Sequence, residues 1–126
     1  MSLGLAWAAA LAWAAALVVT PAAVWLRLRE GRRDTAVIVL SLFLGAQLVG
    51  LGTIEAGGVE SLLERRPGEG LPAWLGATVG AAGLVALAAA WRQEGRADRV
   101  AALAFGLFGT GHLLRELALA AARGAG

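Results

Sequence analysis

The sequence contains no cysteine, no lysine and no tyrosine, and His112 is its single histidine. Without cysteine the chain has no disulfide, no thiolate nucleophile and no cysteine-ligated metal site. Haem held between two histidines is also excluded, because it needs two imidazoles. The sequence has neither a glycine-rich phosphate loop after a strand nor a serine beside a base in a recognisable motif. These absences predict a protein that is not an enzyme, with no cofactor and no metal.

Charged residues are missing from four long stretches. Residues 3–26, 35–54 and 71–91 contain none, and residues 100–122 contain only Arg115 and Glu116. Each stretch has about 20 residues or more, enough to cross a hydrocarbon layer of ~30 Å as a helix. A soluble bundle would need a polar stripe on every helix, and residues 3–26 lack one. The sequence therefore predicts an all-α, integral membrane four-helix bundle in a single domain.

The arginines are distributed unequally between the ends of these stretches. Seven lie in the two turns after the first and third stretches: Arg27, Arg29, Arg32, Arg33, Arg92, Arg96 and Arg99. Three lie on the other side: Arg65, Arg66 and Arg123. Short loops rich in arginine stay in the cytoplasm. We therefore expect a multi-pass protein of the bacterial inner (plasma) membrane with both termini outside.

The basic character of the chain has a second possible meaning. A pI near 11.0 would indicate a nucleic-acid partner in a soluble protein. Here membrane orientation accounts for the arginines, so no nucleic-acid partner is expected. The expected partners are the lipid bilayer and either another membrane protein or a second copy of the chain.

A three-residue motif occurs in both arginine-rich turns. Residues 30–32 read Glu-Gly-Arg, and residues 94–96 read the same, at an offset of 64. The motif predicts two tandem, parallel repeats of a helical hairpin, at about residues 3–56 and 71–122; chance similarity between alanine-rich hairpins is the alternative. Residues 57–70 would form an outer connecting loop with a short interfacial helix.

The shared turn has a structural interpretation. Gly31 and Gly95 can end a helix with positive φ, and Asp34 and Asp98 are placed to cap the helices that follow.

Small residues indicate where helices pack closely. Ser41, Gly45 and Gly52 fall on one face of the second predicted helix. The equivalent face of the fourth helix carries Gly109, so the second and fourth helices are the expected central pair. A further small-residue motif in the third helix consists of Gly76 and Gly80.

One cluster of ionisable residues lies within a predicted span. His112, Arg115 and Glu116 share adjacent parts of one helix face in the outer leaflet, and Glu55 lies at a comparable depth. They could line a polar pocket open to the outside, with Arg115 paired to Glu55 or Glu116. Alternatively, Arg115 extends to the interface, the glutamates lie there, and His112 makes one interhelical hydrogen bond. His112 and Glu116 have a metal-ligand spacing, but two ligands make a weak zinc site.

Three kinds of function fit these features. The first is a noncatalytic accessory, assembly or regulatory subunit of a membrane complex, which is the function we expect. The second is a small homodimeric transporter or channel. The third is a binder of a lipid-like or quinone-like ligand in an outer-leaflet pocket.

Overall fold

The computed structural model describes residues 2–63 and 73–125, and all its regular structure is helical. The elements are α1 (Ser2–Arg29), α2 (Thr35–Gly57), the 3-10 helix η1 (Val59–Leu63), α3 (Ala73–Ala90) and α4 (Arg96–Ala125). Within these ranges the predicted all-α class with four long helices is confirmed.

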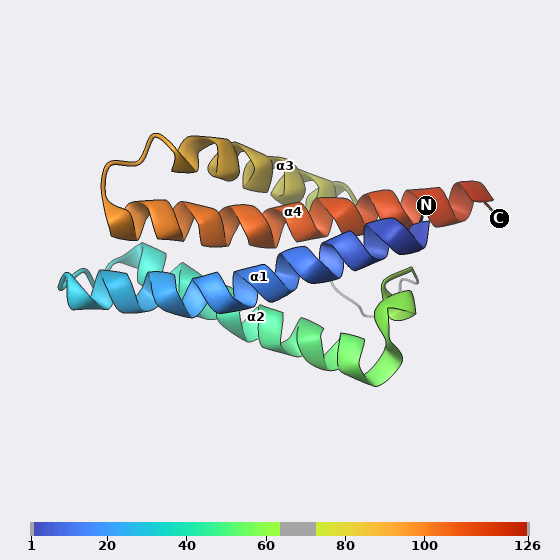
Figure 1. Cartoon of the computed structure of the whole chain (residues 1–126), viewed down its shortest axis with the longest axis horizontal. Helices are drawn as coiled ribbons and strands as arrows, with labels where there is room; N and C mark the ends of the chain where they lie inside the picture. The colour runs from blue at the N-terminus through green and yellow to red at the C-terminus, as the bar shows by residue number, and fades with distance from the viewer. Residues whose placement is uncertain (1, 64–72, 126) are drawn as a thin grey trace.

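The four helices run alternately up and down (Figure 1). The turn between α1 and α2 and the turn between α3 and α4 lie at the same end of the molecule, and both termini lie at the opposite end. The arginine-rich turns therefore share one end, which the predicted membrane orientation requires.

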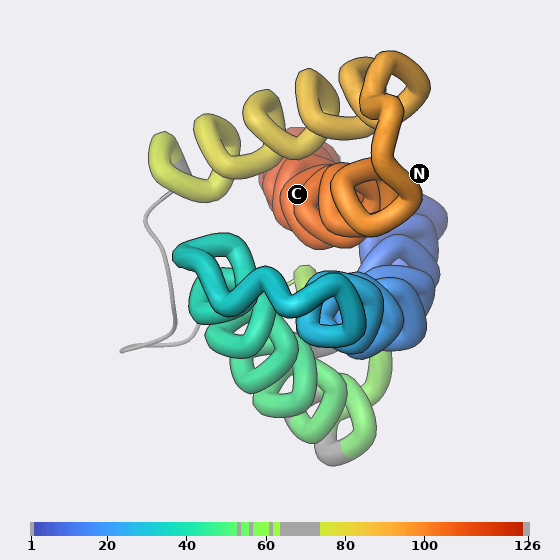
Figure 2. Tube along the Cα trace, turned by 90° about the vertical axis from the view of Figure 1, so that its left-hand side faces the viewer, coloured from blue at the N-terminus to red at the C-terminus, as the bar shows by residue number. Residues whose placement is uncertain are grey.

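Helices α1 and α4 form the central pair and run antiparallel, with α2 and α3 on the outside (Figure 2). Spacings of three and four residues alternate along the contact face of each helix. On α1 the positions are Ala6, Ala9, Trp13, Ala16, Thr20, Ala23 and Arg27. On α4 they are Ala97, Ala101, Ala104, Phe108, Gly111, Arg115 and Ala118. We call this contact the alanine seam; its small side chains let the two backbones approach closely.

The expectation that the second and fourth helices form the central pair is wrong, because α2 packs mainly on α1 and touches α4 little. It does so through Leu40 and Gln47, which are buried. Ser41, Gly45 and Gly52 face away and are exposed. A Cβ added at Gly45 or Gly52 would meet nothing within 4 Å, so this face of α2 packs against no other element among the described residues.

Helix α3 packs only on α4 among the described elements, and glycines make that contact. A Cβ added at Gly109 would lie 2.7 Å from the Cα of Gly83, and Gly80 lies against Leu113. Gly76 lies against the side chain of Glu116. Helices therefore pack closely at Gly76, Gly80 and Gly109. The neighbour of Gly109, however, is α3 and not α2 as expected.

The two turns differ in detail. Gly31 has φ +75°, and Asp34 is the N-cap of α2, its side chain accepting a hydrogen bond from the Val37 amide. In the described residues positive φ occurs only at Gly31 and Gly58. The expectation that Gly95 ends a helix with positive φ is therefore wrong. Asp98 lies in the first turn of α4, inside the helix rather than at its cap.

The helix boundaries explain this difference. Helices α1 and α3 end at Arg29 and Ala90, and α2 and α4 begin at Thr35 and Arg96, so equivalent ends lie 61 residues apart rather than 64. The shared tripeptide thus occupies different places in the two turns. Duplication of a hairpin remains a prediction.

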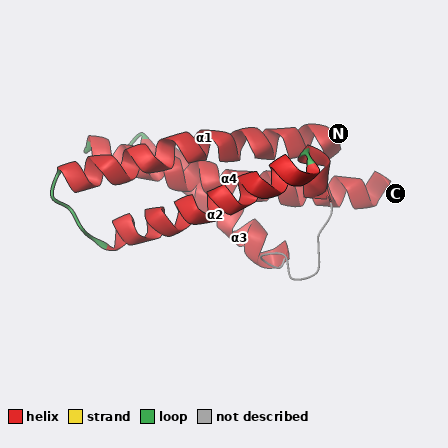
Figure 3. Ribbon diagram, turned by 90° about the horizontal axis from the view of Figure 1, so that it is seen from below, coloured by secondary structure: helices red, strands yellow, loops and turns green. Residues whose placement is uncertain are grey.

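A short helix follows α2, as expected, and it packs against the bundle. In η1, Val59 and Leu62 are buried in a cluster with Ala6 of α1 and Ala118 of α4. Figure 3 shows this segment near the N-terminus, at the end opposite the turns. The rest of the predicted outer loop, with Arg65 and Arg66, lies outside the described residues.

In the part of the chain that the structure describes, two helical segments are long and apolar enough to cross a membrane, Ser2–Arg29 and Thr35–Gly52. A third apolar segment, Trp74–Ala90, is shorter. The interior of the bundle is mostly alanine, and the largest fully buried side chains are Leu40 and Thr20. Large apolar side chains instead lie on the surface, where Leu11, Val18 and others are exposed.

Candidate functional site

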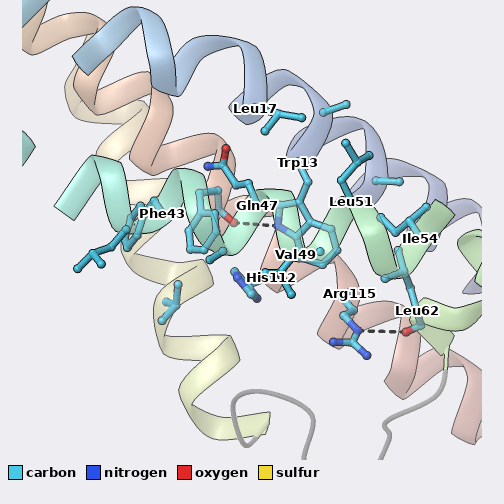
Figure 4. Close-up of a pocket in the computed structure, with 17 residues that line it drawn as sticks. Trp13, Leu17, Phe43, Gln47, Val49, Leu51, Ile54, Leu62, His112 and Arg115 are labelled. Carbon is cyan, nitrogen blue, oxygen red and sulfur yellow. Dashed lines mark hydrogen bonds between the residues drawn. The ribbon is translucent and has the colours of Figure 1, made fainter. Parts of the chain in front are cut away.

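A cavity of about 590 Å³ lies between α1, α2 and α4, with one wall residue from α3, Val79. It exists because α2 and α3 make no contact with each other in the described ranges while both flank the central pair. Among the described residues, apolar side chains form most of its lining, and the polar ones are Gln47, His112 and Arg115 beside the indole of Trp13 (Figure 4).

Aromatic rings form the wall nearest α4. The rings of Phe43 and Phe108 are stacked with centroids 4.4 Å apart. The ring of His112 lies edge-on to Phe108 at 4.8 Å and to Trp13 at 5.3 Å. Trp13 donates a hydrogen bond from Nε1 to the carbonyl oxygen of Phe108 at 3.3 Å, and it packs against Gly111, where a Cβ would collide with the indole. His112 is thus held at the cavity wall by aromatic contacts from two helices.

Arg115 lies at the end of the cavity next to η1. Its Nε donates a hydrogen bond to the carbonyl oxygen of Leu62 at 3.2 Å, which joins α4 to η1 (Figure 4). Leu62 also lines the cavity. The 3-10 helix therefore contributes to the wall at this end of the cavity and is joined there to Arg115.

The predicted ionisable cluster is divided between two faces. His112 and Arg115 line the cavity, whereas Glu116 lies against Gly76 of α3 and Glu55 is exposed. The helix geometry accounts for the division, since residues three and four positions after His112 project about 60° and 40° to opposite sides of it. The described cavity thus contains two of the four residues expected in a polar pocket, its described lining is mostly apolar, and neither Glu55 nor Glu116 forms part of that lining.

Gln47 connects α2 to α1 inside the bundle. Its Nε2 donates to the hydroxyl of Thr20 at 3.1 Å, and that hydroxyl donates to the carbonyl oxygen of Ala16 at 2.6 Å. Because the hydroxyl has a single proton, it must accept from Gln47, which fixes the orientation of the amide. The opposite oxygen, Oε1, is buried with no hydrogen-bond partner in the described part of the chain.

A second cavity of about 350 Å³ continues from the first toward the turns. The two share Phe43, Val79 and Phe108 in their walls, and the second adds Phe105 and the Gly83 region of α3. We call the combined space the α2/α3 groove. Sequence reasoning missed it, because it depends on the separation of α2 from α3, which no local pattern encodes.

A second polar cluster lies at the end that carries the turns. The buried side chain of Arg27 binds Asp34 through Nη2 at 2.7 Å and Nε at 3.3 Å, and it binds Asp98 through Nη1 at 2.9 Å. Arg32 lies 3.0 Å from the same carboxylate oxygen of Asp98. Hydrogen bonding to Arg27 lowers the pKa of Asp34 below its ordinary value.

The other arginines of the turns lie at the surface. Arg29 is placed over the ring of Trp25 at 5.1 Å, and Arg99 donates to the carbonyl oxygen of Gln93. The remaining three are exposed: Arg33, Arg92 and Arg96. Of the seven predicted cytoplasmic arginines, Arg27 is therefore the exception, because it is buried.

Comparison with protein-family models, with curated proteins and with solved structures finds no match to this chain. Within the described ranges, no group of three or more histidine, cysteine, aspartate or glutamate residues is placed to hold a metal ion.

Proposed function

We propose that this chain is a multi-pass membrane protein whose four helices all span the bilayer. The distribution of apolar side chains supports this, since Leu11, Val18, Val49 and Val85 are exposed while the interior is alanine. A soluble protein usually buries its large apolar side chains. Only 22% of the residues in the apolar window of α1 and 11% of those in that of α2 are buried, unlike the core helix of a soluble protein.

In this proposal the turns face the cytoplasm and both termini lie outside. The excess of arginine at the turn end supports that orientation. Exposed tryptophans support the same placement of the helices across the bilayer, because Trp25 and Trp91 lie near the turns while Trp7 and Trp74 lie near the other end. Amphipathic indole rings favour the two headgroup regions. Helix α4 would then carry His112 and Arg115 in the outer leaflet.

We further propose that the protein is noncatalytic and binds an apolar molecule from the bilayer in the α2/α3 groove. The observation that carries this proposal is the cavity of about 590 Å³, a volume typical of small-molecule sites. Its apolar lining and few polar groups at one end match an elongated ligand with a polar head. Because α2 and α3 do not touch, such a ligand can enter sideways from the lipid.

Native mass spectrometry of the protein, purified from membranes in a mild detergent, tests this role. We expect a small apolar molecule to remain bound. Ala46→Trp, which adds an indole to the cavity wall, should abolish retention of that molecule. Ala81→Trp makes the same change at an exposed position of α3 outside the lining, and it should retain the ligand. Equal retention by both variants would refute binding in the groove.

The expected accessory-subunit role is a second candidate, supported by the exposed small-residue face of α2. Ser41, Gly45 and Gly52 leave room for a helix of another membrane protein or of a second copy to approach closely. The same mass measurement distinguishes this role. A chain that emerges with another polypeptide lost on Gly45→Leu, and with no small molecule, would favour the accessory role over ligand binding.

A further inference from the structure

We propose that the ligand of the α2/α3 groove is a neutral phenol or hydroquinone with an apolar tail, and that its hydroxyl group donates a hydrogen bond to Oε1 of Gln47. The tail would extend along the apolar part of the groove. This inference rests on the proposed function and specifies the chemistry of its ligand.

The amide oxygen of Gln47 is the first argument. Gln47 lines the larger cavity and is only 6% exposed. Its Oε1 is buried, and no hydrogen-bond donor reaches it in the part of the chain that the structure describes. A buried acceptor without a donor destabilises a protein, and native structures rarely contain one. A ligand hydroxyl at this wall would supply the donor, because the broad last torsion of glutamine lets Oε1 turn toward it.

The direction of the existing hydrogen bonds is the second argument. The Thr20 hydroxyl donates its one proton to the carbonyl oxygen of Ala16 at 2.6 Å, so it accepts from Nε2 of Gln47 at 3.1 Å. The amide nitrogen is thereby held toward α1, and the oxygen is the group left to recognise a ligand. A ligand that only accepts hydrogen bonds, such as a quinone or an ether, leaves Oε1 unpaired.

Aromatic rings near the amide are the third argument. Phe43 and Gln47 are four residues apart on α2, so they are neighbours on one face of that helix. The rings of Phe43 and Phe108 are stacked, and both line the cavity together with Trp13. Aromatic rings attract one another in offset and edge-on arrangements. An aromatic ligand therefore suits this wall while its hydroxyl group reaches the amide.

The depth of Gln47 in the proposed topology favours a neutral ligand. Gln47 lies about 12 residues after the start of α2 at Thr35, hence ~18 Å along the helix and near the middle of a ~30 Å hydrocarbon layer. A charged group is costly at that depth, whereas a hydroxyl that makes a hydrogen bond is tolerated. The described lining of the smaller cavity is apolar throughout, which suits the tail.

The test compares 4-nonylphenol with its methyl ether, which has the same ring and tail without the O–H donor. Binding to purified protein in zwitterionic nanodiscs would be measured with radiolabelled forms of each, after subtraction of partitioning into protein-free nanodiscs. We expect the phenol to bind about threefold to tenfold more tightly, the effect of one neutral hydrogen bond. A third compound, 4-nonylcyclohexanol, keeps the hydroxyl without the aromatic ring, and it should bind more weakly than the phenol.

Three variants test the role of the amide. Gln47→Met keeps an unbranched side chain without the amide, and it should bind the phenol and the ether equally. Thr20→Val removes the hydroxyl that holds Nε2, so the amide can turn its nitrogen to the ligand. We expect this variant to lose the preference because it binds the ether more tightly. Ser41→Ala removes an exposed hydroxyl of α2 outside the cavity lining, and it should keep the preference.

The two proposals fail in different ways. Equal binding of the phenol and the ether by the unaltered protein would overturn recognition of the hydroxyl and leave the groove as an apolar site. A preference for the phenol that persists in Gln47→Met would also overturn it. Equal binding of 4-nonylcyclohexanol and the phenol would overturn recognition of the aromatic ring. Absence of binding by all three compounds would overturn both this inference and the proposed function.

Discussion

Nη1 of Arg27, near the end of α1, lies 2.9 Å from a carboxylate oxygen of Asp98, which lies 71 residues further along the chain in the first turn of α4. The same guanidinium binds Asp34, the N-cap of α2, through two of its nitrogens. One buried side chain thus joins the ends of three helices. Sequence analysis placed Arg27 among arginines that only set orientation.

Removing this guanidinium should destabilise the bundle. Arg27→Gln removes the buried cation and leaves Asp34 and Asp98 with the more exposed Arg32 alone. We expect a loss of about 2 kcal/mol, below the buried-pair value because both carboxylates are partly exposed. The measurement is the thermal unfolding midpoint in detergent. Arg33→Gln, at an exposed position of the same turn, should change it little. Equal effects of the two substitutions would contradict the assigned role of Arg27.

The same cluster predicts a dependence of stability on acidity. Because Arg27 lowers the pKa of Asp34 in the folded protein, ionised Asp34 favours folding above its ordinary pKa of 3.8, and this contribution is lost as pH falls through the lower, folded pKa. Unfolding midpoints measured between about pH 3 and pH 7 should therefore fall at the acidic end. Asp34→Asn should weaken that fall. Glu94→Gln, at an exposed position in the other turn, should leave it unchanged.

The glycine contact between α3 and α4 should tolerate no side chain. A Cβ at Gly109 would lie 2.7 Å from the Cα of Gly83, so Gly109→Ala must separate the two helices, at a cost of about 1–3 kcal/mol. Gly45→Ala makes the same change where nothing lies within 4 Å, and we expect no loss of stability. Unfolding midpoints of the two variants provide the comparison. An unaffected Gly109→Ala variant would contradict the close approach of α3 to α4.

Membrane topology can be tested by labelling, because the chain has no cysteine to remove. Arg33→Cys would place a thiol in the first turn, and Gly124→Cys would place one near the C-terminus. In intact cells a membrane-impermeant maleimide should label Gly124→Cys alone, and opening the membrane should add Arg33→Cys. The reverse pattern would invert the orientation. In the proposed topology, α2, α3 and α4 cross the membrane between the two sites, which places the sites on opposite sides. Labelling of both variants in intact cells would contradict that topology.

The sequence was sufficient to predict the four helices, since three of them are long stretches without charge, the fourth contains only Arg115 and Glu116, and arginines and turn residues separate them. It was also sufficient to predict the cap at Asp34 and the positive φ at Gly31, because both depend on residues within one turn. The close contacts between α3 and α4 occur at glycines, and both helices have small residues at helical spacing in the sequence. Local chemistry determines all of these features.

The order of packing could not be predicted in the same way. Glycines on α2 and on α4 look alike in the sequence, yet Gly45 and Gly52 of α2 are exposed, while Gly109 contacts α3. The alternating spacing of small residues along α1 and α4 could have identified the central pair. This spacing is hard to recognise because both helices are rich in alanine. The groove depends on that pairing, so only His112 and Arg115 of its wall were anticipated.

The alanines of the alanine seam do not by themselves fix the register of α1 against α4. Ala9, Ala16 and Ala23 recur every seven residues, so a shift of one helix by two turns would bring an alanine against an alanine again. The correct register must therefore come from the residues that interrupt the series. Arg27 against Asp98 at one end and Trp13 against Gly111 in the middle are the contacts that a shifted pair could not reproduce.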